Sequence, residues 1–293
     1  MRLKLIYNPA AGRGRTRRHV AEVEAYLRSR GAHLNVHAST GAGDLTRVAA
    51  ESSRAGYDRV VICGGDGSVH FAVREFDLRA GVLGVVPLGS GDDFARVTGI
   101  PRQVEKACDA VLDGATREVD VAFANGIRYL GVAGLGFDSQ VAAFANRVKW
   151  LGGSLVYLYS IFRVLPQFKP HRVRMVNDDG ARSLEIMFAV VGNSRQYGGG
   201  IRVVPAAEID DGVLDYCVVH RTSRMQLLKT LPLAYSGGHV RKPFVETGRG
   251  RSFRFETETP LEVYADGELV TRTPVSFEIG GRLRVAVPAQ SIS

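Results

Sequence analysis

The chain has 293 residues, of which 45% are apolar and 23% charged, a composition typical of a folded globular protein rather than a disordered one. Because a single hydrophobic core seldom grows beyond about 250–300 residues, this length predicts two domains. The net charge of +8 favours anionic partners such as nucleotide phosphates or an acidic membrane surface. No zinc-finger or RNP-like motif is present, so nucleic acid is not an expected partner.

Strands and helices alternate at short spacing through residues 1–121. Apolar runs predict strands at 3–7, 34–38, 59–63 and 82–87, and helical spacing predicts helices at 20–27, 45–55, 69–76 and 104–112. Asp44 is the expected N-cap of the second of these helices. The alternation is typical of a parallel sheet covered by helices, so we expect an α/β domain here.

Three glycine-rich stretches directly follow predicted strands: residues 8–14 (NPAAGRG), 64–68 (GGDGS) and 89–93 (GSGDD). Since ligands of parallel sheets bind at the carboxyl ends of the strands, we expect the three stretches to lie along one sheet edge. Glycines let the backbone approach a ligand closely, and the amide groups that begin the following helices attract anions. The pattern favours a phosphate site, where Asp66 would face a magnesium ion or a ligand hydroxyl.

A purely structural interpretation of the same residues stays open. Asp66, Asp92 and Asp93 are of a type that commonly caps helices, and the arginines that follow Gly12 are typical of a solvated helix face. The sequence contains neither GxxxxGK[ST] nor GxGxxG, so a P-loop or a dinucleotide-type Rossmann fingerprint is unsupported.

The pattern changes in residues 122–293, where short apolar runs are separated by turn signals. We expect strands at 119–132, 173–177, 184–192, 212–220, 252–255, 261–265, 275–279 and 283–287, with helical insertions near 139–165 and 223–236. This predicts a second, mainly antiparallel β-sandwich domain, whose last residues can pack back on the first domain.

Two acidic segments of the second domain could carry chemistry. Glu208, Asp210, Asp211 and Asp215 offer the oxygen ligands that Mg²⁺ prefers, although Asp211-Gly212 is also a common hairpin turn. The segment YADGELV (264–270) is another hairpin signal, in which a carboxylate such as Glu268 could act as a general base if it faces a cleft.

Residues 148–165 are apolar at helical spacing on nearly all sides. We expect either a buried helix or one wall of an acyl-chain or membrane-contact site, with basic residues at its ends. These basic residues are Arg147, Lys149, Arg163 and Lys169.

The three cysteines, Cys63, Cys108 and Cys217, are widely spaced and odd in number, which favours a reducing compartment over a disulfide framework. The N-terminal residues show no secretory signal, and no apolar stretch reaches the roughly 18 residues that span a bilayer. We therefore expect a cytoplasmic protein with peripheral contact at the inner face of the membrane.

Taken in order, the motifs resemble those of the diacylglycerol kinase catalytic-domain family, which includes bacterial lipid kinases, sphingosine kinases and ceramide kinases. The matching segments are NPAAG (8–12), GGDGS (64–68), PLGSGDDFAR (87–96), GLGFDSQV (134–141), GGGIRVVPAAEIDDGVLD (199–215) and DGE (266–268). A GGDG-type loop also occurs in NAD kinases and phosphofructokinases, whereas the six motifs together are specific.

The resemblance implies the two-domain fold of NAD kinase and diacylglycerol kinase, with ATP in the cleft between the domains. It implies that Glu268 accepts a proton with Asp266 in support, that Asp66 positions nucleotide or Mg²⁺, and that the Asp211 side chain holds Mg²⁺. The carbonyls of Glu208 and Val213 would complete the metal site. The expected ATP contacts are Asn8, Pro9, Ala10, Ala11, Gly12, Arg13, Gly14, Thr40, Gly64, Gly65, Asp66, Gly67, Ser68, Val69, His70 and Ser90.

The chain departs from the family pattern at two kinds of position. Serine replaces the usual threonine in both GGDGS and GSGDD, which keeps the hydroxyl. Asp92 replaces the usual asparagine and is expected to add negative charge near the phosphates.

The resemblance implies an ATP-dependent kinase that phosphorylates a lipid hydroxyl, of a diacylglycerol-like or sphingoid-like lipid. The alternatives are a kinase of a soluble alcohol such as NAD, and a non-catalytic nucleotide- or lipid-binding protein. A homodimer formed through exposed sheet edges is a further expectation.

Overall fold

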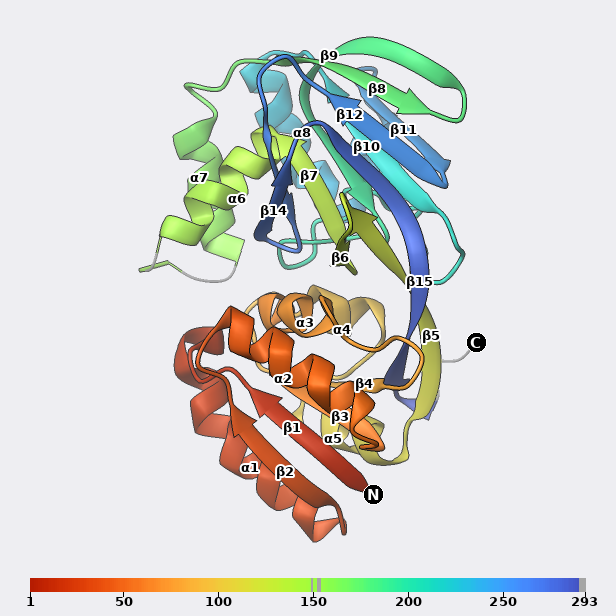
Figure 1. Cartoon of the computed structure of the whole chain (residues 1–293). Coiled ribbons are helices and arrows are strands. Elements are labelled where there is room, and N and C mark those ends of the chain that lie inside the picture. The colour runs from red at the N-terminus through yellow and green to blue at the C-terminus, as the bar shows by residue number, and fades with distance from the viewer. Residues whose placement is uncertain (149, 152–153, 290–293) are drawn as a thin grey trace. The chain divides into compact units, whose positions relative to one another are not determined.

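The computed structural model describes residues 1–148, 150–151 and 154–289, and the chain divides into two compact units (Figure 1). The first unit holds Met1–Val119 together with the chain from Gly281 onward, and the second holds Asp120–Gly280. The predicted fold class is confirmed: an α/β unit and a mainly antiparallel β unit.

The first unit is built on a parallel sheet with the strand order β4-β3-β1-β2. The strands are β1 (Arg2–Tyr7), β2 (His33–Ala38), β3 (Arg59–Gly64) and β4 (Val82–Pro87). A further parallel partner comes from the end of the chain, where Arg284 and Val285 of β15 (Val275–Val287) pair with Val82 and Leu83. The expected parallel sheet is therefore present.

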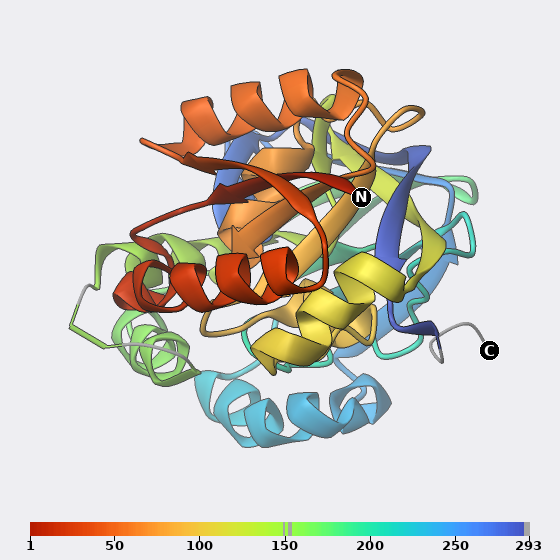
Figure 2. The ribbon, with the colours of Figure 1, turned by 90° about the horizontal axis from the view of Figure 1, so that it is seen from below.

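The helices of this unit cover both faces of the sheet. They are α1 (Arg15–Ser29), α2 (Ala42–Arg54), α3 (Asp66–Val73), α4 (Asp93–Val97) and α5 (Val104–Asp113). Because β2 and β3 lie on opposite sides of β1, right-handed crossovers bring α1 and α2 to opposite faces. Figure 2 shows α2 on one face, with α1 and α5 on the other.

One expected cap is wrong. Helix α2 begins at Ala42 with Gly41 at its N-cap, so Asp44 lies inside the first turn. Its carboxylate reaches backward, accepting the Thr40 amide at 3.1 Å and contacting Nε2 of His37 at 2.8 Å. These two contacts hold the pKa of Asp44 far below its usual range and fix the turn that carries Thr40.

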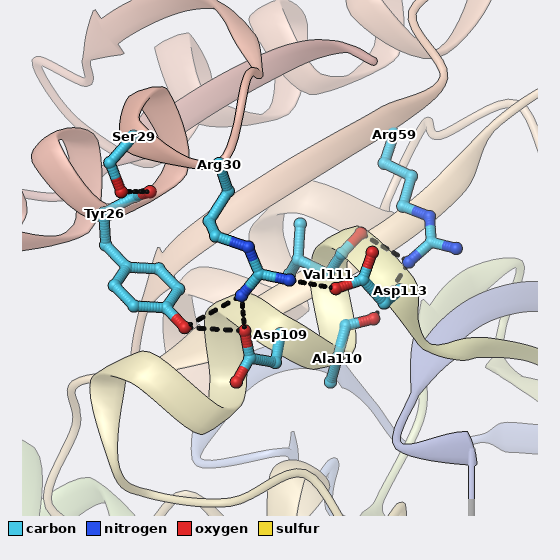
Figure 3. Close-up of polar contacts among 8 residues, drawn as sticks. All are labelled: Tyr26, Ser29, Arg30, Arg59, Asp109, Ala110, Val111 and Asp113. Atoms are coloured by element: carbon cyan, nitrogen blue, oxygen red, sulfur yellow. Dashed lines mark hydrogen bonds and ion pairs between the residues drawn. The ribbon is translucent and has the colours of Figure 1, made fainter.

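Polar contacts fasten α1 to α5 (Figure 3). The guanidinium of Arg30 reaches Asp109 and Asp113, each at 2.6 Å, and the Tyr26 hydroxyl donates to Asp109 at 2.7 Å. Arg59 donates to main-chain carbonyls at the end of α5 and so satisfies acceptors that the helix itself leaves open.

Antiparallel pairing builds the second unit. Its strands run in the order β14-β13-β7-β9-β8-β12-β15, with β10 and β11 added through β9. They are β5 (Ala115–Ala124), β6 (Ile127–Tyr129), β7 (Val132–Gly136), β8 (His171–Asn177), β9 (Gly180–Gly192), β10 (Leu214–His220), β11 (Val245–Gly250), β12 (Ser252–Glu256), β13 (Glu262–Ala265), β14 (Glu268–Arg272) and the first part of β15.

Several expected boundaries in this unit are wrong. The run 119–132 is broken by a turn, because Asn125 and Gly126 have positive φ angles of 49° and 79°. The two strands expected at 275–279 and 283–287 are one strand, β15, and the strands β11 and β14 were not predicted. The helical insertion near 139–165 is two helices, α6 (Phe137–Arg147) and α7 (Ser154–Val164), and the later insertion is α8 (Arg224–Ser236).

The second unit has two apolar layers. Residues of β9 contribute to both layers. Val191 and Ile186 belong to a cluster formed by strand residues, whereas Val190 and Met187 belong to a cluster that includes residues of the helices α6 and α8. The register shift opposite Val219 and His220 accounts for the break in strict alternation. Among the described residues, no helix is long and apolar enough to cross a membrane.

Candidate functional site

The three glycine-rich stretches of the first unit meet, as expected from their positions after β1, β3 and β4. A Cβ atom built on Gly12 would lie 2.2 Å from the carbonyl oxygen of Leu88, and one on Gly89 would lie 2.4 Å from the Cα of Gly65. A Cβ on Gly64 would lie 2.4 Å from Oγ of Ser68. Only glycine permits these approaches, so the backbones themselves form the surface at this sheet edge.

Two helices begin at this edge: α3 follows the extended residue Gly65, whereas α1 continues from a short 3-10 helix, Ala11–Gly14. Helix α1 follows Gly14, whose φ of 82° is in the left-handed region, and α3 follows Gly65. Over the described residues, neither helix has a side-chain hydrogen bond at its N-cap. The first amides of a helix carry partial positive charge, so the start of α3 favours a negatively charged group. At the start of α1, the Arg15 amide already donates to the carbonyls of Ala11 and Gly12.

Asp66 links two of the three stretches. It is the first residue of α3, and its Oδ1 accepts the amide of Phe94, in the first turn of α4, at 3.1 Å. The interpretation in which Asp66 caps its own helix is wrong, because the N-cap of α3 is Gly65 and Asp66 already lies in the first turn. The half-buried carboxylate thus joins the stretch after β3 to the stretch after β4.

Asp92 does not add an uncompensated negative charge. It is 3% exposed and has a left-handed φ of 53°. Its Oδ1 accepts the Gly89 amide at 2.8 Å, and its Oδ2 lies 2.9 Å from Nη2 of Arg102. Burial raises the pKa of Asp92, while Arg102 opposes that rise. The expectation of added charge near phosphates is corrected by this ion pair.

The other expected ATP contacts of the first unit differ in exposure. Asn8 is half-buried and its Oδ1 accepts the amide of Ala10 at 3.0 Å, which shapes the turn after β1. The exposed members are Ala10, Thr40 and Ser90, the half-buried ones are Pro9, Ala11, Gly12, Gly14, Gly65 and Gly67, and the buried ones are Gly64, Ser68, Val69 and His70. The side chain of Arg13 lies outside the described residues.

The DGE segment of the second unit is a tight hairpin turn between β13 and β14. Asp266 has a φ of 52°, and its carboxylate accepts the amides of Leu130 at 3.1 Å and Gly131 at 2.9 Å. Glu268, half-buried, is the first residue of β14. Asp266 therefore holds the turn that precedes Glu268.

The expected metal residues do not form a ready cation site. One oxygen of Asp211 contacts Arg249, and the other accepts the Val213 amide at 3.2 Å. Arg249 also lies 3.3 Å from Asp215. Across 1–148, 150–151 and 154–289, no group of three or more His, Cys, Asp or Glu side chains could hold a metal ion. An arginine thus neutralises the carboxylate that Mg²⁺ would need, and we derive no catalytic step through a metal at Asp211.

A pocket lies within the second unit, between the sheet and the helices α6, α7 and α8. Its wall is almost wholly apolar and includes Phe137, Val141, Ile161, Phe188, Leu227 and Phe244. Its polar lining residues are Thr230, His239 and the pair in which Asp138 accepts a hydrogen bond from the hydroxyl of Tyr197. Burial raises the pKa of Asp138 to about 6.

Asp138 and Tyr197 were not predicted as site residues. Asp138 stands within the motif GLGFDSQV, where a single acid among apolar and small residues was the available signal. Tyr197 comes from a distant segment, so only the fold could bring the two together. The apolar helix expected over 148–165 is shorter in the structure, where α7 spans Ser154–Val164. Lys149, one of the basic residues expected at its ends, lies outside the described residues.

Comparison with known proteins covers both units. Residues 2–124 match the model of the diacylglycerol kinase catalytic domain, and residues 131–287 match that of the YegS C-terminal NAD kinase beta sandwich-like domain. A crystal structure of a diacylglycerol kinase from Bacillus anthracis str. Sterne has the same fold, with a TM-score of 0.75 and 22% identity, covering 99% of this chain and 98% of the other.

Curated relatives named diacylglycerol kinase match over nearly the full length. The protein from Mycobacterium tuberculosis (strain ATCC 25618 / H37Rv) is 33% identical over 96% of this chain and 91% of its own. The one from Bacillus subtilis (strain 168) is 28% identical over 94% of this chain and 92% of its own. The motifs, the two folds and these relatives agree, and the chain belongs to the diacylglycerol kinase catalytic-domain family.

Proposed function

We propose that this protein is an ATP-dependent lipid kinase that transfers the γ-phosphoryl group of ATP to a lipid hydroxyl. The observation that carries the proposal is the meeting of three glycine-rich stretches at one sheet edge, together with the start of α3, which has no side-chain cap. Such an edge suits a triphosphate, because amides can surround it without the bulk of side chains. ATP would enter as its Mg²⁺ complex, in which the cation neutralises phosphate charge.

In the proposed reaction, Glu268 accepts the proton of the lipid hydroxyl as the oxygen attacks the γ-phosphorus. A new oxygen–phosphorus bond forms, the bond from the γ-phosphorus to the β,γ-bridging oxygen breaks, and ADP leaves. Asp66 would hold the nucleotide in line with the acceptor, and Asp266 would keep Glu268 in place through its two amide contacts.

The pocket of the second unit favours a lipid over a soluble alcohol. Its apolar wall would bind hydrocarbon, while Asp138 and Tyr197 provide one polar point that could bind a hydroxyl or other polar group. A polar acceptor such as NAD would leave its own polar groups unpaired against this wall. A diacylglycerol-like or sphingoid-like lipid is the acceptor class that fits.

The test is an incubation of the purified protein with total lipid extract, Mg²⁺ and ATP labelled at the γ-phosphate, followed by mass spectrometry of the lipids. We expect label in a phosphorylated lipid. A parallel panel of soluble alcohols that includes NAD separates the alternatives. Label only in a soluble product would replace the lipid acceptor, and ATP left unconsumed in every mixture would favour the non-catalytic binding protein.

We further propose that α7 contacts an anionic membrane surface. Leu155, Leu158 and Phe162 lie along one side of this helix and are 63%, 42% and 55% exposed. Tyr157 and Ile161, on the other side, line the pocket. Arg163 and Lys169, both exposed, follow the apolar stripe and would approach acidic headgroups. A helix with one face on the membrane and one on the pocket suits an enzyme whose substrate is a membrane lipid.

Replacement of Phe162 by glutamate is expected to weaken binding to anionic vesicles by roughly tenfold or more, because it removes a large apolar group and adds a repelled charge. Co-sedimentation with phosphatidylglycerol-containing vesicles measures the change. Tyr235→Glu is the matched control, since Tyr235 is a 46% exposed aromatic residue of another helix. Equal losses in both variants would remove α7 as the contact.

Asp138 gives a prediction for stability against pH. Because the folded-state pKa of Asp138 is raised from 3.8 to about 6, the ionised form destabilises the fold, by up to about 3 kcal/mol above pH 7. Asp138→Asn cannot ionise, so its stability relative to the wild type should rise between pH 4 and pH 7. Urea unfolding across that range measures this, with the exposed Asp178→Asn as control. Parallel pH curves for Asp138→Asn and the wild type would contradict the burial of a charged carboxylate.

A further inference from the structure

We propose that Arg102 is a positioning residue for the nucleotide, which holds the turn at residues 88–93 in its binding shape through Asp92. This inference rests on the proposed function and names a residue outside every motif that carried the resemblance. Arg102 follows α4 and belongs to none of the three glycine-rich stretches.

One nitrogen of Arg102 contacts both parts of the turn. Its Nη2 lies 2.9 Å from Oδ2 of Asp92 and donates to the carbonyl of Gly89 at 3.1 Å. The other carboxylate oxygen of Asp92 accepts the Gly89 amide at 2.8 Å. Gly89 is therefore fixed at its amide by Asp92 and at its carbonyl by Arg102. Arg15, at the start of α1, adds a contact of 3.3 Å to the same carbonyl.

The carboxylate of Asp92 needs this cation. Its side chain is 1% exposed, and a buried charge that loses its partner is strongly destabilising. The Asp92 backbone also has a left-handed φ of 53°, a conformation that persists only when surrounding contacts enforce it. Without Arg102, Asp92 would lose its ion-pair partner and Gly89 would lose one of its anchors, leaving the positive charge of Arg15 to act on both residues.

A shift of the backbone at Gly89 would displace the neighbouring glycine-rich stretch, residues 64–68. A Cβ on Gly89 would lie 2.4 Å from the Cα of Gly65 and 2.5 Å from Oδ1 of Asp92, so no space separates the two backbones. Gly65 precedes Asp66 and the amides that begin α3. Arg102 thus acts on the phosphate-binding amides from a distance, through Asp92 and Gly89.

The Asp92–Arg102 pair can be tested by replacing either or both members with neutral residues. Asparagine at 92 keeps an oxygen for the Gly89 amide and needs no cation, so loss of Arg102 should lower ATP affinity much less in the Asp92→Asn background than in the wild type. Arg102→Gln should raise the Kd and KM for ATP about tenfold, the effect of losing one charge partner, and leave kcat at saturating ATP nearly unchanged. The double variant should recover most of the lost affinity.

The measurements are calorimetric ATP binding to the full chain with Mg²⁺, steady-state kinetics with the lipid found above, and thermal unfolding of every variant. Arg28→Gln, which removes the same charge from an exposed pair near the far end of α1, is the control and should match the wild type. If the wild type binds ATP and Arg102→Gln binds equally well, or if the double variant binds no better than Arg102→Gln, the positioning role is overturned. If the wild type itself binds no ATP, the proposed function fails first and the role of Arg102 falls with it.

Discussion

Replacement of Glu268 by alanine is expected to lower kcat by roughly 10²–10⁴-fold, the range for loss of a general base, while ATP affinity stays close to that of the wild type. The side chain begins β14 directly after a turn that Asp266 anchors to the amides of Leu130 and Gly131. The anchored hairpin fixes the backbone position of Glu268, which suits a group that must meet one hydroxyl proton.

The expected result is checked by turnover at saturating lipid and ATP, together with direct ATP binding. Glu262→Ala is the matched control, because Glu262 lies on β13 of the same hairpin and pairs with Arg272 at 3.2 Å on the surface. Glu262→Ala should keep its activity. Turnover of the Glu268→Ala variant equal to that of the wild type would remove the base assignment.

Replacement of Asp66 is expected to lower activity by at least about 100-fold, since interactions of a few kcal/mol with the charged nucleotide complex would be lost. Asp66→Ala also removes the acceptor of the Phe94 amide, so it combines two effects. Asp66→Asn separates them, because an asparagine oxygen can accept that amide while the charge disappears. We expect both variants to lose activity and only Asp66→Ala to lose stability.

Steady-state kinetics and thermal unfolding of the two Asp66 variants provide the measurement. Glu75→Gln, at an exposed position shortly after α3, removes one negative charge from the same region and should behave as the wild type does. Unchanged kinetics in Asp66→Asn would reduce the GGDGS segment to a structural element that joins α3 to α4.

The sequence predicts the first unit well because its signals are local. Strand β3 is a run of apolar residues that ends at Gly64, and β4 is another that ends at Pro87. A few adjacent residues are therefore enough to predict both the strand and the turn that follows it. The parallel alternation then places residues 8–14, 64–68 and 89–93 at one edge, where the structure brings them into contact.

The second unit was harder to predict because its decisive features depend on distant residues. Strand β11 (VETGRG) is half polar and carries two glycines, and it becomes a strand by pairing with β10. Strand β13 pairs with β14 through a register shift, so β14 lacks the regular alternation of apolar and polar residues by which a strand is predicted. The pairing of Asp138 with Tyr197, and that of Asp92 with Arg102, follow from tertiary packing and have no periodic signal.

The pairing of Arg284 and Val285 with β4 has a consequence for synthesis on the ribosome. The strands β1 to β4 emerge first, yet their sheet cannot gain this strand until the whole second unit, Asp120–Gly280, has been translated. Until then β4 presents unpaired amides and carbonyls, the kind of edge that invites association between nascent chains. Completion of the first unit thus waits for synthesis of the second unit, and a chain cut short before Arg284 would keep that edge open.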